Sequence, residues 1–178
     1  LMYSLHSSLV NQAKIAAIKK IREDFGGLKV LDLGCGPGTN AHLFRGADYS
    51  GIDISEGYVA WAKKRFPQFI FRVGDVVKTA WGGSFDVILI NSFFHHLDDA
   101  KVANLLARIA ASLKEGGRAI VEEPLLPGKG EWYYRMLMRL DQGRYFRNFN
   151  HWRRLIKAAG LLIDKCDFYD LKFLAIKG

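Results

Sequence analysis

Three alternating glycines, Gly34, Gly36 and Gly38, follow an apolar run within residues 30–40 and are the clearest sign of chemistry in the chain. Glycine has no Cβ, so it adopts positive φ and lets a ligand approach the backbone closely. A glycine turn at the end of a strand indicates a nucleotide-like cofactor. The dinucleotide fingerprint G-x-G-x-x-G would need its third glycine at Thr39, so a site that binds the pyrophosphate of a dinucleotide is disfavoured.

Acidic residues mark the ends of three successive apolar runs. Asp32 precedes the glycines, and Asp53 follows about 20 residues later, where nucleoside-binding folds place a carboxylate on the ribose hydroxyls. Asp75 ends the third run. Each acid also has a structural interpretation, as a turn residue or, for Asp53, as the N-cap of the next helix. Their joint order favours a cofactor site.

Residues 31–39 resemble motif I of the class I S-adenosylmethionine-dependent methyltransferases, of the small-molecule, type 11/12-like kind. The resemblance covers residues 28–125 by motifs and the rest by topology only. It implies S-adenosylmethionine as cofactor, S-adenosylhomocysteine as product and no metal, and it implies that Asp75 contacts the adenine amino group. The cofactor-binding residues on this interpretation are Asp32, Gly34, Cys35, Gly36, Gly38, Asp53, Ile54, Asp75, Val76, Asn91 and Ser92.

Two adjacent histidines, His95 and His96, follow the fourth apolar run, in a segment that resembles the loop beside the methionine part of the cofactor in this family. Methyl transfer chiefly requires alignment of nucleophile, methyl and sulfur. An imidazole suits removal of a proton from a hydroxyl acceptor, whereas capping or packing is the alternative for at least one histidine. Glu123, preferred over Glu122, is a further catalytic candidate that would orient the acceptor, although strand alternation directs only one of the two inward.

Residues 125–148 interrupt the alternation of strands and helices and are expected to form a lid over the acceptor. The N-terminal segment 1–26, with a helical pattern over 7–25, is expected to cover the same pocket. Two arginines in the lid region can clamp an anion bidentately. The aromatic residues of the lid region can contact the acceptor or, equally well, pack in the core. The candidate acceptor-binding residues are Tyr3, Tyr133, Arg144 and Arg147.

The elements that must position these residues alternate along the chain. Strands are predicted near 29–33, 49–53, 69–73, 85–90 and 117–122, and helices near 38–45, 56–65, 99–113 and 149–159. This alternation predicts a parallel sheet with helices on both faces. Two last runs, 161–169 and 171–177, are nearly contiguous and must pair antiparallel. The family resemblance implies an α/β, Rossmann-like, doubly wound sheet of seven strands in the order 3-2-1-4-5-7-6, with the last strand antiparallel.

Composition restricts the protein class. The 178 residues, 49% of them hydrophobic, predict one domain over 1–178 with a buried core. Two distant cysteines argue against a disulfide scaffold or a C-x-x-C metal site. No apolar run is long enough to span a bilayer and no signal sequence is recognised, which predicts a soluble cytoplasmic protein. The net charge of +8 lies mostly in the last third, as expected for attraction of an anion or for a solvated helix face.

Three functions are compatible with the sequence. The first is a methyltransferase that acts on O or N of a small acceptor, which is anionic or linked to a lipid or sugar. The second is a nucleic-acid or protein amino methyltransferase, although the residues after Asn91 lack the prolines of the Asn-Pro-Pro-Tyr motif, which disfavours a nucleic-acid partner. The third is a noncatalytic module that only binds the cofactor.

Overall fold

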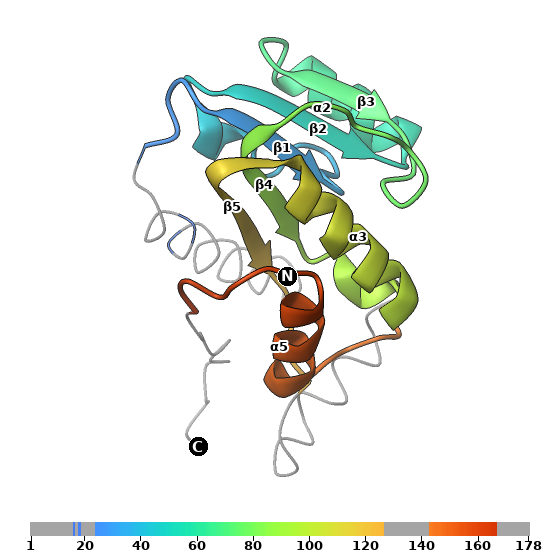
Figure 1. Ribbon diagram of the computed structural model, residues 1–178. Helices are drawn as coiled ribbons and strands as arrows, with labels where there is room; N and C mark the ends of the chain where they lie inside the picture. The colour runs from blue at the N-terminus through green and yellow to red at the C-terminus, as the bar shows by residue number, and fades with distance from the viewer. Residues whose placement is uncertain (1–15, 17, 19–23, 127–142, 167–178) are drawn as a thin grey trace, which may run out of the picture.

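Five parallel strands form the centre of the computed structural model, in the order β3-β2-β1-β4-β5 (Figure 1). The structure describes residues 16, 18, 24–126 and 143–166. The order of these strands agrees with the first five positions of the expected sheet. The strands are β1 (Lys29–Leu33), β2 (Asp48–Asp53), β3 (Ile70–Val73), β4 (Phe85–Asn91) and β5 (Leu113–Glu122).

The expected sixth strand does not form over the part of it that the structure describes. Residues 161–166 carry no strand, and residues 167–178 lie outside the described residues, as does the predicted strand 171–177. Leu162 is 92% exposed and does not pack onto the sheet, although its neighbour Leu161 packs against the buried cluster that includes Leu31. The seven-strand order is therefore supported for five strands only.

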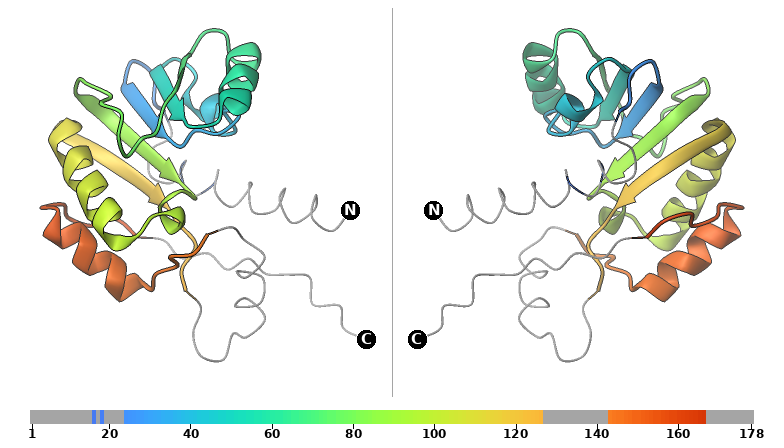
Figure 2. Two further views of the ribbon diagram at one scale, coloured as in Figure 1. Left: turned by 90° about the vertical axis from the view of Figure 1, so that its right-hand side faces the viewer. Right: turned by 90° about the vertical axis from the view of Figure 1, so that its left-hand side faces the viewer.

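Helices flank the sheet on both faces, as predicted (Figure 2). Residues 16 and 18 are also helical, within the predicted helix 7–25. The predicted helix 38–45 is reduced to one 3₁₀ turn, since Gly38 and Gly46, both at positive φ, lie on either side of it. The helices with described bounds are α2 (Glu56–Arg65), α3 (Asp99–Ser112) and α5 (Phe149–Ala158), with the 3₁₀ helices η1 (Ala41–Phe44) and η2 (Phe94–His96).

Two buried clusters lie on opposite faces of the sheet because successive strand side chains point to opposite sides. Val30 packs with Val59 of α2 in one cluster. Leu31 packs with Leu105 of α3 and Trp152 of α5 in the other. The central strands β1 and β4 are buried from both sides, which makes them a rigid base for the loops that follow them.

Local capping sets where the helices begin. The hydroxyl of Ser55 accepts a hydrogen bond from the Tyr58 N–H at the start of α2. The carboxylate of Asp98 and the amide oxygen of Asn148 do the same for α3 and α5. Ser55, and not Asp53, is thus the N-cap of α2, which removes the capping interpretation of Asp53.

All five strands are parallel, so their carboxyl ends meet at one edge of the sheet, and ligands of open α/β sheets bind outside this edge. The order changes direction between β1 and β4. The loops after these two strands, 34–40 and 92–97, therefore lie beside each other at the expected binding position. No helix among the described residues is long and apolar enough to cross a membrane.

Candidate cofactor and acceptor site

The glycine turn after β1 has the backbone conformation that its sequence predicts. Gly34, Gly36 and Gly38 have φ of +76°, +52° and +74°. A Cβ added to Gly34 would approach the Phe93 ring to 2.9 Å, whereas a Cβ on Gly36 would meet nothing within 4 Å. Gly36 is thus the point where the backbone borders open space and a ligand can approach it.

Asp53, at the end of β2, joins the glycine turn to the neighbouring loops. Its Oδ2 accepts a hydrogen bond from Gly36 N at 2.8 Å, and its Oδ1 accepts one from Ser55 N at 2.9 Å. Its backbone oxygen accepts a third from Gly74 N at 2.9 Å. Each carboxylate oxygen can accept a second bond, so Asp53 keeps capacity for two ligand hydroxyls. Ile54, the next residue, is 70% exposed and offers an apolar surface beside it.

Asp75 begins a tight turn after β3. Its Oδ1 accepts a hydrogen bond from Val77 N at 2.9 Å, and Lys78 Nζ lies 3.5 Å from Oδ2. The side chain is 31% exposed, so it borders solvent. Val76 is buried and packs into the core, so its side chain is turned away from the position predicted for the cofactor.

Asp32 lies within β1, wholly buried below the glycine turn. Tyr49 donates its hydroxyl proton to Oδ2 at 2.6 Å, and Oδ1 has no hydrogen-bond partner within the described structure. Burial, with a further contribution from the charge of Asp53, raises the pKa of Asp32 from 3.8 to about 7. A half-paired buried carboxyl of this kind suits a neighbouring cationic group.

Cys35 is buried within the turn and packs on Gly51, where an added Cβ would come within 2.7 Å of Sγ. Burial raises the pKa of the Cys35 thiol, with the charges of Asp32 and Asp53 adding to the effect. The thiol is thus inert. The Cys35 N–H donates to Ile52 O and so ties the glycine turn to β2. The side chain packs in the core.

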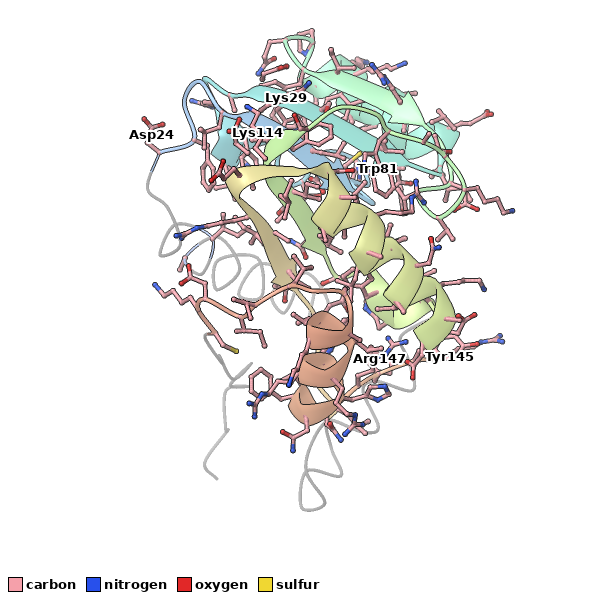
Figure 3. The ribbon with its side chains drawn as sticks, in the orientation of Figure 1. Asp24, Lys29, Trp81, Lys114, Tyr145 and Arg147 are labelled. Atoms are coloured by element: carbon pink, nitrogen blue, oxygen red, sulfur yellow. The ribbon has the colours of Figure 1, made fainter. Side chains whose placement is uncertain are left out.

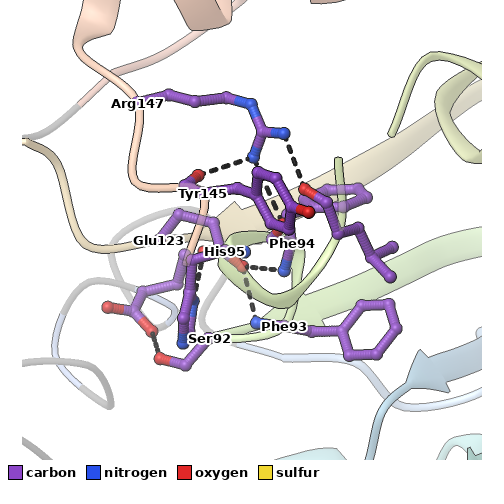
Figure 4. A network of polar contacts seen from close by, with 9 residues as sticks. Ser92, Phe93, Phe94, His95, Glu123, Tyr145 and Arg147 are labelled. Atoms are coloured by element: carbon purple, nitrogen blue, oxygen red, sulfur yellow. Dashed lines mark hydrogen bonds and ion pairs between the residues drawn. The ribbon is translucent and has the colours of Figure 1, made fainter. Parts of the chain in front are cut away.

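Glu123 does not face an acceptor, contrary to the sequence prediction. Its Oε1 accepts hydrogen bonds from Phe93 N and Phe94 N, both at 2.6 Å. Its Oε2 accepts from His95 Nδ1 at 2.8 Å and from His95 N at 3.3 Å (Figure 4). Four donors fill the four lone-pair positions of a carboxylate. Glu123 therefore holds the start of η2.

Arg147 occupies the other end of the same loop, so its predicted role as half of an anion clamp does not fit the structure. Its guanidinium donates to the backbone oxygens of Phe94, Leu97 and Tyr145 at 3.2, 2.7 and 2.9 Å (Figure 4). Nε donates to Asp99 Oδ1 at 2.8 Å. The side chain is 2% exposed. It lies beside α5 (Figure 3). A carboxylate at the start and a guanidinium at the end fix the backbone of residues 93–97.

The two histidines have different environments. His95 is 4% exposed and its ring stacks on Phe146, with centroids 5.3 Å apart. Its backbone oxygen accepts hydrogen bonds from Arg144 N and Tyr145 N, so the chain returning from the lid region runs along it. His96 is exposed. Of the two histidines, His96 is the one that presents its side chain to solvent.

Ser92 is a strained residue directly after β4. It has φ of +51°, a conformation that is uncommon for residues other than glycine and that often marks functional sites. Its N–H donates to Glu122 O at 2.7 Å, and its hydroxyl donates to Glu122 Oε2 at 3.0 Å. Ser92 and Asn91, which ends β4, thus lie where the sequence predicts cofactor contacts.

Two aromatic residues that the sequence patterns do not single out also lie at this site. Phe93 covers Gly34, and Phe146 covers His95. Aromatic residues after a strand and after the lid region were the available signal, but aromatic residues are common in cores. Arg144 is exposed, as an acceptor-binding role requires. Tyr3 and Tyr133 lie outside the described residues.

Comparison with known proteins identifies the family of this fold. Residues 30–117 match the family model described as "Methyltransferase domain". The chain is 35% identical over 100 residues to a trans-aconitate 2-methyltransferase of Methylobacterium nodulans, covering 54% of this chain and 38% of that protein. It is 32% identical over 95 residues to a malonyl-[acyl-carrier protein] O-methyltransferase of Bacillus cytotoxicus, covering 50% and 33%. The chain thus covers well under two thirds of the length of either curated relative.

The solved structure of magnesium protoporphyrin IX methyltransferase from Synechocystis PCC 6803, with bound S-adenosylhomocysteine, has the same fold. Its TM-score is 0.68 at 20% identity, covering 88% of this chain and 74% of that one. Residues 30–117 therefore form a methyltransferase domain. Their fold is that of the S-adenosylhomocysteine-bound enzyme.

The residues present fit the cofactor of this family, S-adenosylmethionine. The open space at Gly36 admits a nucleoside, and Asp53 has hydrogen-bonding capacity for its hydroxyls. The unpaired Oδ1 of Asp32 suits a cationic amino group. Among the described residues, no group of three or more His, Cys, Asp or Glu could hold a metal ion.

Proposed function

We propose that this chain is an S-adenosylmethionine-dependent methyltransferase that modifies an oxygen or nitrogen of a small, anionic or lipid- or sugar-linked acceptor. The observation that carries the proposal is the hydrogen bond between Gly36 N and Asp53 Oδ2 at 2.8 Å. This bond joins the glycine turn to the acid of the next strand, and the Gly74 N to Asp53 O bond extends the connection to the turn of Asp75. Three sequence motifs thereby form one site.

The cofactor, when bound, supplies a methyl group on a sulfonium, which is already a good leaving group. Asp53 would accept hydrogen bonds from the ribose hydroxyls, Ile54 would line one side of the adenine, and Asp75 would accept a hydrogen bond from its amino group. Asp32 and the strand end at Asn91 and Ser92 would bind the amino-acid part. Alignment of the reacting groups with exclusion of water would supply most of the catalysis.

The loop of residues 93–97 serves as the floor of the acceptor pocket. Glu123 and Arg147 fix its two ends, so its backbone does not move when the acceptor arrives. His95 is a positioning residue within this loop, packed on Phe146. His96, which is exposed, is the better candidate for a general base if the acceptor is a hydroxyl.

Anionic acceptors are preferred within this proposal. Two of the curated relatives are named for acidic acceptors, trans-aconitate and a malonyl group, and another is named for demethylmenaquinone. A carboxylate oxygen is already a nucleophile and needs no general base. The exposed Arg144 is positioned at the end of the lid region, where it can pair with such an acceptor. The lid over 125–148 and the covering segment 1–26 remain part of the proposal.

Calorimetry and a turnover assay test the proposal. The purified chain is titrated with S-adenosylhomocysteine and then incubated with methyl-labelled S-adenosylmethionine and, separately, trans-aconitate, a malonyl thioester, a metabolite extract, bulk RNA and a protein mixture. Binding together with label in a small acid supports the proposal. Label in RNA or protein instead would show the amino methyltransferase alternative, and binding without turnover on a metabolite extract would show a noncatalytic module.

A matched pair of variants tests the cofactor site itself. Asp53→Ala removes the acid at the carboxyl end of β2, and Asp48→Ala removes an exposed acid at the opposite end of the same strand. We expect Asp53→Ala to weaken S-adenosylhomocysteine binding at least about tenfold, because each hydrogen bond to a charged acceptor is worth roughly 1.5 to 3 kcal/mol. Asp48→Ala should bind like the wild type. Equal affinities in all three proteins would refute the site.

A further inference from the structure

Arg108 of α3 reaches across to the turn that carries Asp75. Its Nη1 donates to the backbone oxygens of Val76 and Val77 at 3.1 and 2.6 Å. Its Nη2 donates to the backbone oxygen of Thr79 at 2.6 Å. A single side chain thus satisfies three carbonyl groups of one turn. Only a planar guanidinium offers so many donors in a fixed arrangement.

Trp81 holds the guanidinium from its other side. The Arg108 Cζ lies 3.9 Å from the centre of the Trp81 ring, within the range of a cation–π interaction. The Trp81 indole N–H donates to the hydroxyl of Ser112 at the end of α3, 3.1 Å away. Trp81 is 8% exposed, so this stack is largely shielded from water. Trp81 is therefore bound to α3 at two points, the Arg108 guanidinium and the Ser112 hydroxyl.

The carbonyl groups that Arg108 binds belong to the same turn that orients Asp75. Asp75 Oδ1 accepts from Val77 N, and Asp75 O accepts from Lys78 N and Thr79 N at 3.0 and 2.7 Å. The direction of the Asp75 carboxylate thus depends on where the backbone of residues 76–79 lies. That backbone is held from α3 by the Arg108 guanidinium.

We propose that Arg108 is a positioning residue for the nucleobase end of the cofactor site. It fixes the turn of residues 75–79 from α3 and thereby aims the Asp75 carboxylate at the exocyclic amino group of adenine. This inference rests on the proposed function. It adds that selection for adenine depends on a residue of α3 that does not touch the cofactor.

Two ligands and three variants test this proposal. S-adenosylhomocysteine and its analogue with hydrogen in place of the adenine amino group are titrated by calorimetry. Arg108→Met keeps much of the side-chain length and removes every donor, and Arg108→Lys keeps the charge. Asn104→Met is the control on the same helix, because Asn104 is exposed and uncharged. The ratio of the two dissociation constants is unaffected by any unfolded fraction, because unfolding weakens both ligands equally.

We expect the wild type to prefer the amino-bearing ligand about tenfold or more, as for one hydrogen bond to a charged acceptor. Arg108→Met should lose most of this preference, Arg108→Lys should regain part of it, and Asn104→Met should keep it. A preference in Arg108→Met equal to that of the wild type overturns the inference, even if both ligands bind more weakly. A wild type that binds neither ligand overturns the proposed function as well, so the two failures are distinct.

Discussion

His95 and Glu123 form a buried pair in which Nδ1 and Oε2 lie 2.8 Å apart, with side chains only 5% and 3% exposed. The same carboxylate also accepts the N–H groups of residues 93–95. A buried carboxylate needs such partners, because an unpaired charge is costly in a protein interior. The pair therefore fixes the loop beside the proposed cofactor site, and the role of Glu123 is structural.

The first prediction concerns Glu123→Gln. In glutamine an NH₂ group replaces one of the two carboxylate oxygens. This group cannot accept hydrogen bonds from the buried N–H donors that Glu123 binds. We expect the free energy of unfolding in urea to fall by about 2 kcal/mol or more, since hydrogen bonds to charged groups contribute roughly 1.5 to 3 kcal/mol. Glu115→Gln, the same change at an exposed position of β5, should leave it within about 0.5 kcal/mol. Equal stabilities would contradict the structural role.

The second prediction compares two glycines with nearly identical backbones. Gly36 and Gly82 have φ of +52° and +54°, and an added Cβ meets nothing within 4 Å at either. Valine should destabilise both similarly, because a β-branched residue is strained at positive φ. Only Gly36→Val should abolish cofactor binding, since Gly36 lies at the carboxyl edge of the sheet and Gly82 precedes β4. Calorimetry measures the affinity of both variants for S-adenosylhomocysteine. Similar losses of affinity would show that Gly36 is not part of the cofactor site.

The third prediction is a pH dependence that Asp32 causes. Folding raises the pKa of Asp32 from 3.8 to about 7, so the folded state binds more protons between these values. The free energy of unfolding therefore falls as pH rises through this range. We expect the stability of Asp32→Asn, relative to the wild type, to increase by roughly 3 kcal/mol from pH 5 to pH 8.

Urea unfolding of both proteins at several pH values measures this difference, and all other titrating groups cancel in the comparison. The Tyr49 hydroxyl can donate to the asparagine oxygen as it does to Asp32 Oδ2, so that bond is retained. Parallel stability curves would show that Asp32 does not titrate in this range.

The fourth prediction separates Arg147 from Arg144. Arg147→Met removes the donor to three carbonyl oxygens and leaves Asp99 without that partner, so stability should fall by about 3 kcal/mol. Arg144→Met, at an exposed position, should change stability by no more than about 0.5 kcal/mol. It should instead raise the KM for an anionic acceptor. The reverse pattern in unfolding and steady-state kinetics would restore Arg147 to the acceptor site.

The sequence by itself determined the strands, most helices and the glycine turn, because their signals are local. An apolar run that ends in glycine or aspartate marks a strand end wherever the rest of the chain lies. Ser55, Asp98 and Asn148 begin their helices through bonds to residues three positions later. Positive φ at Gly34 likewise needs no distant partner.

Only the tertiary structure decided what Glu123, Arg147 and Arg108 do. Each is a charged residue that the sequence allows at an acceptor site, on a surface or in the interior. Apart from the Tyr145 oxygen, two positions from Arg147, the partners of Glu123 and Arg147 lie 28 to 53 positions away, and those of Arg108 lie 29 to 32 away. Strand register and helix packing bring these residues together. The role of a buried charge depends on the donors or acceptors that the fold places around it. Local spacing in the sequence does not determine that arrangement, because the partners come from distant parts of the chain.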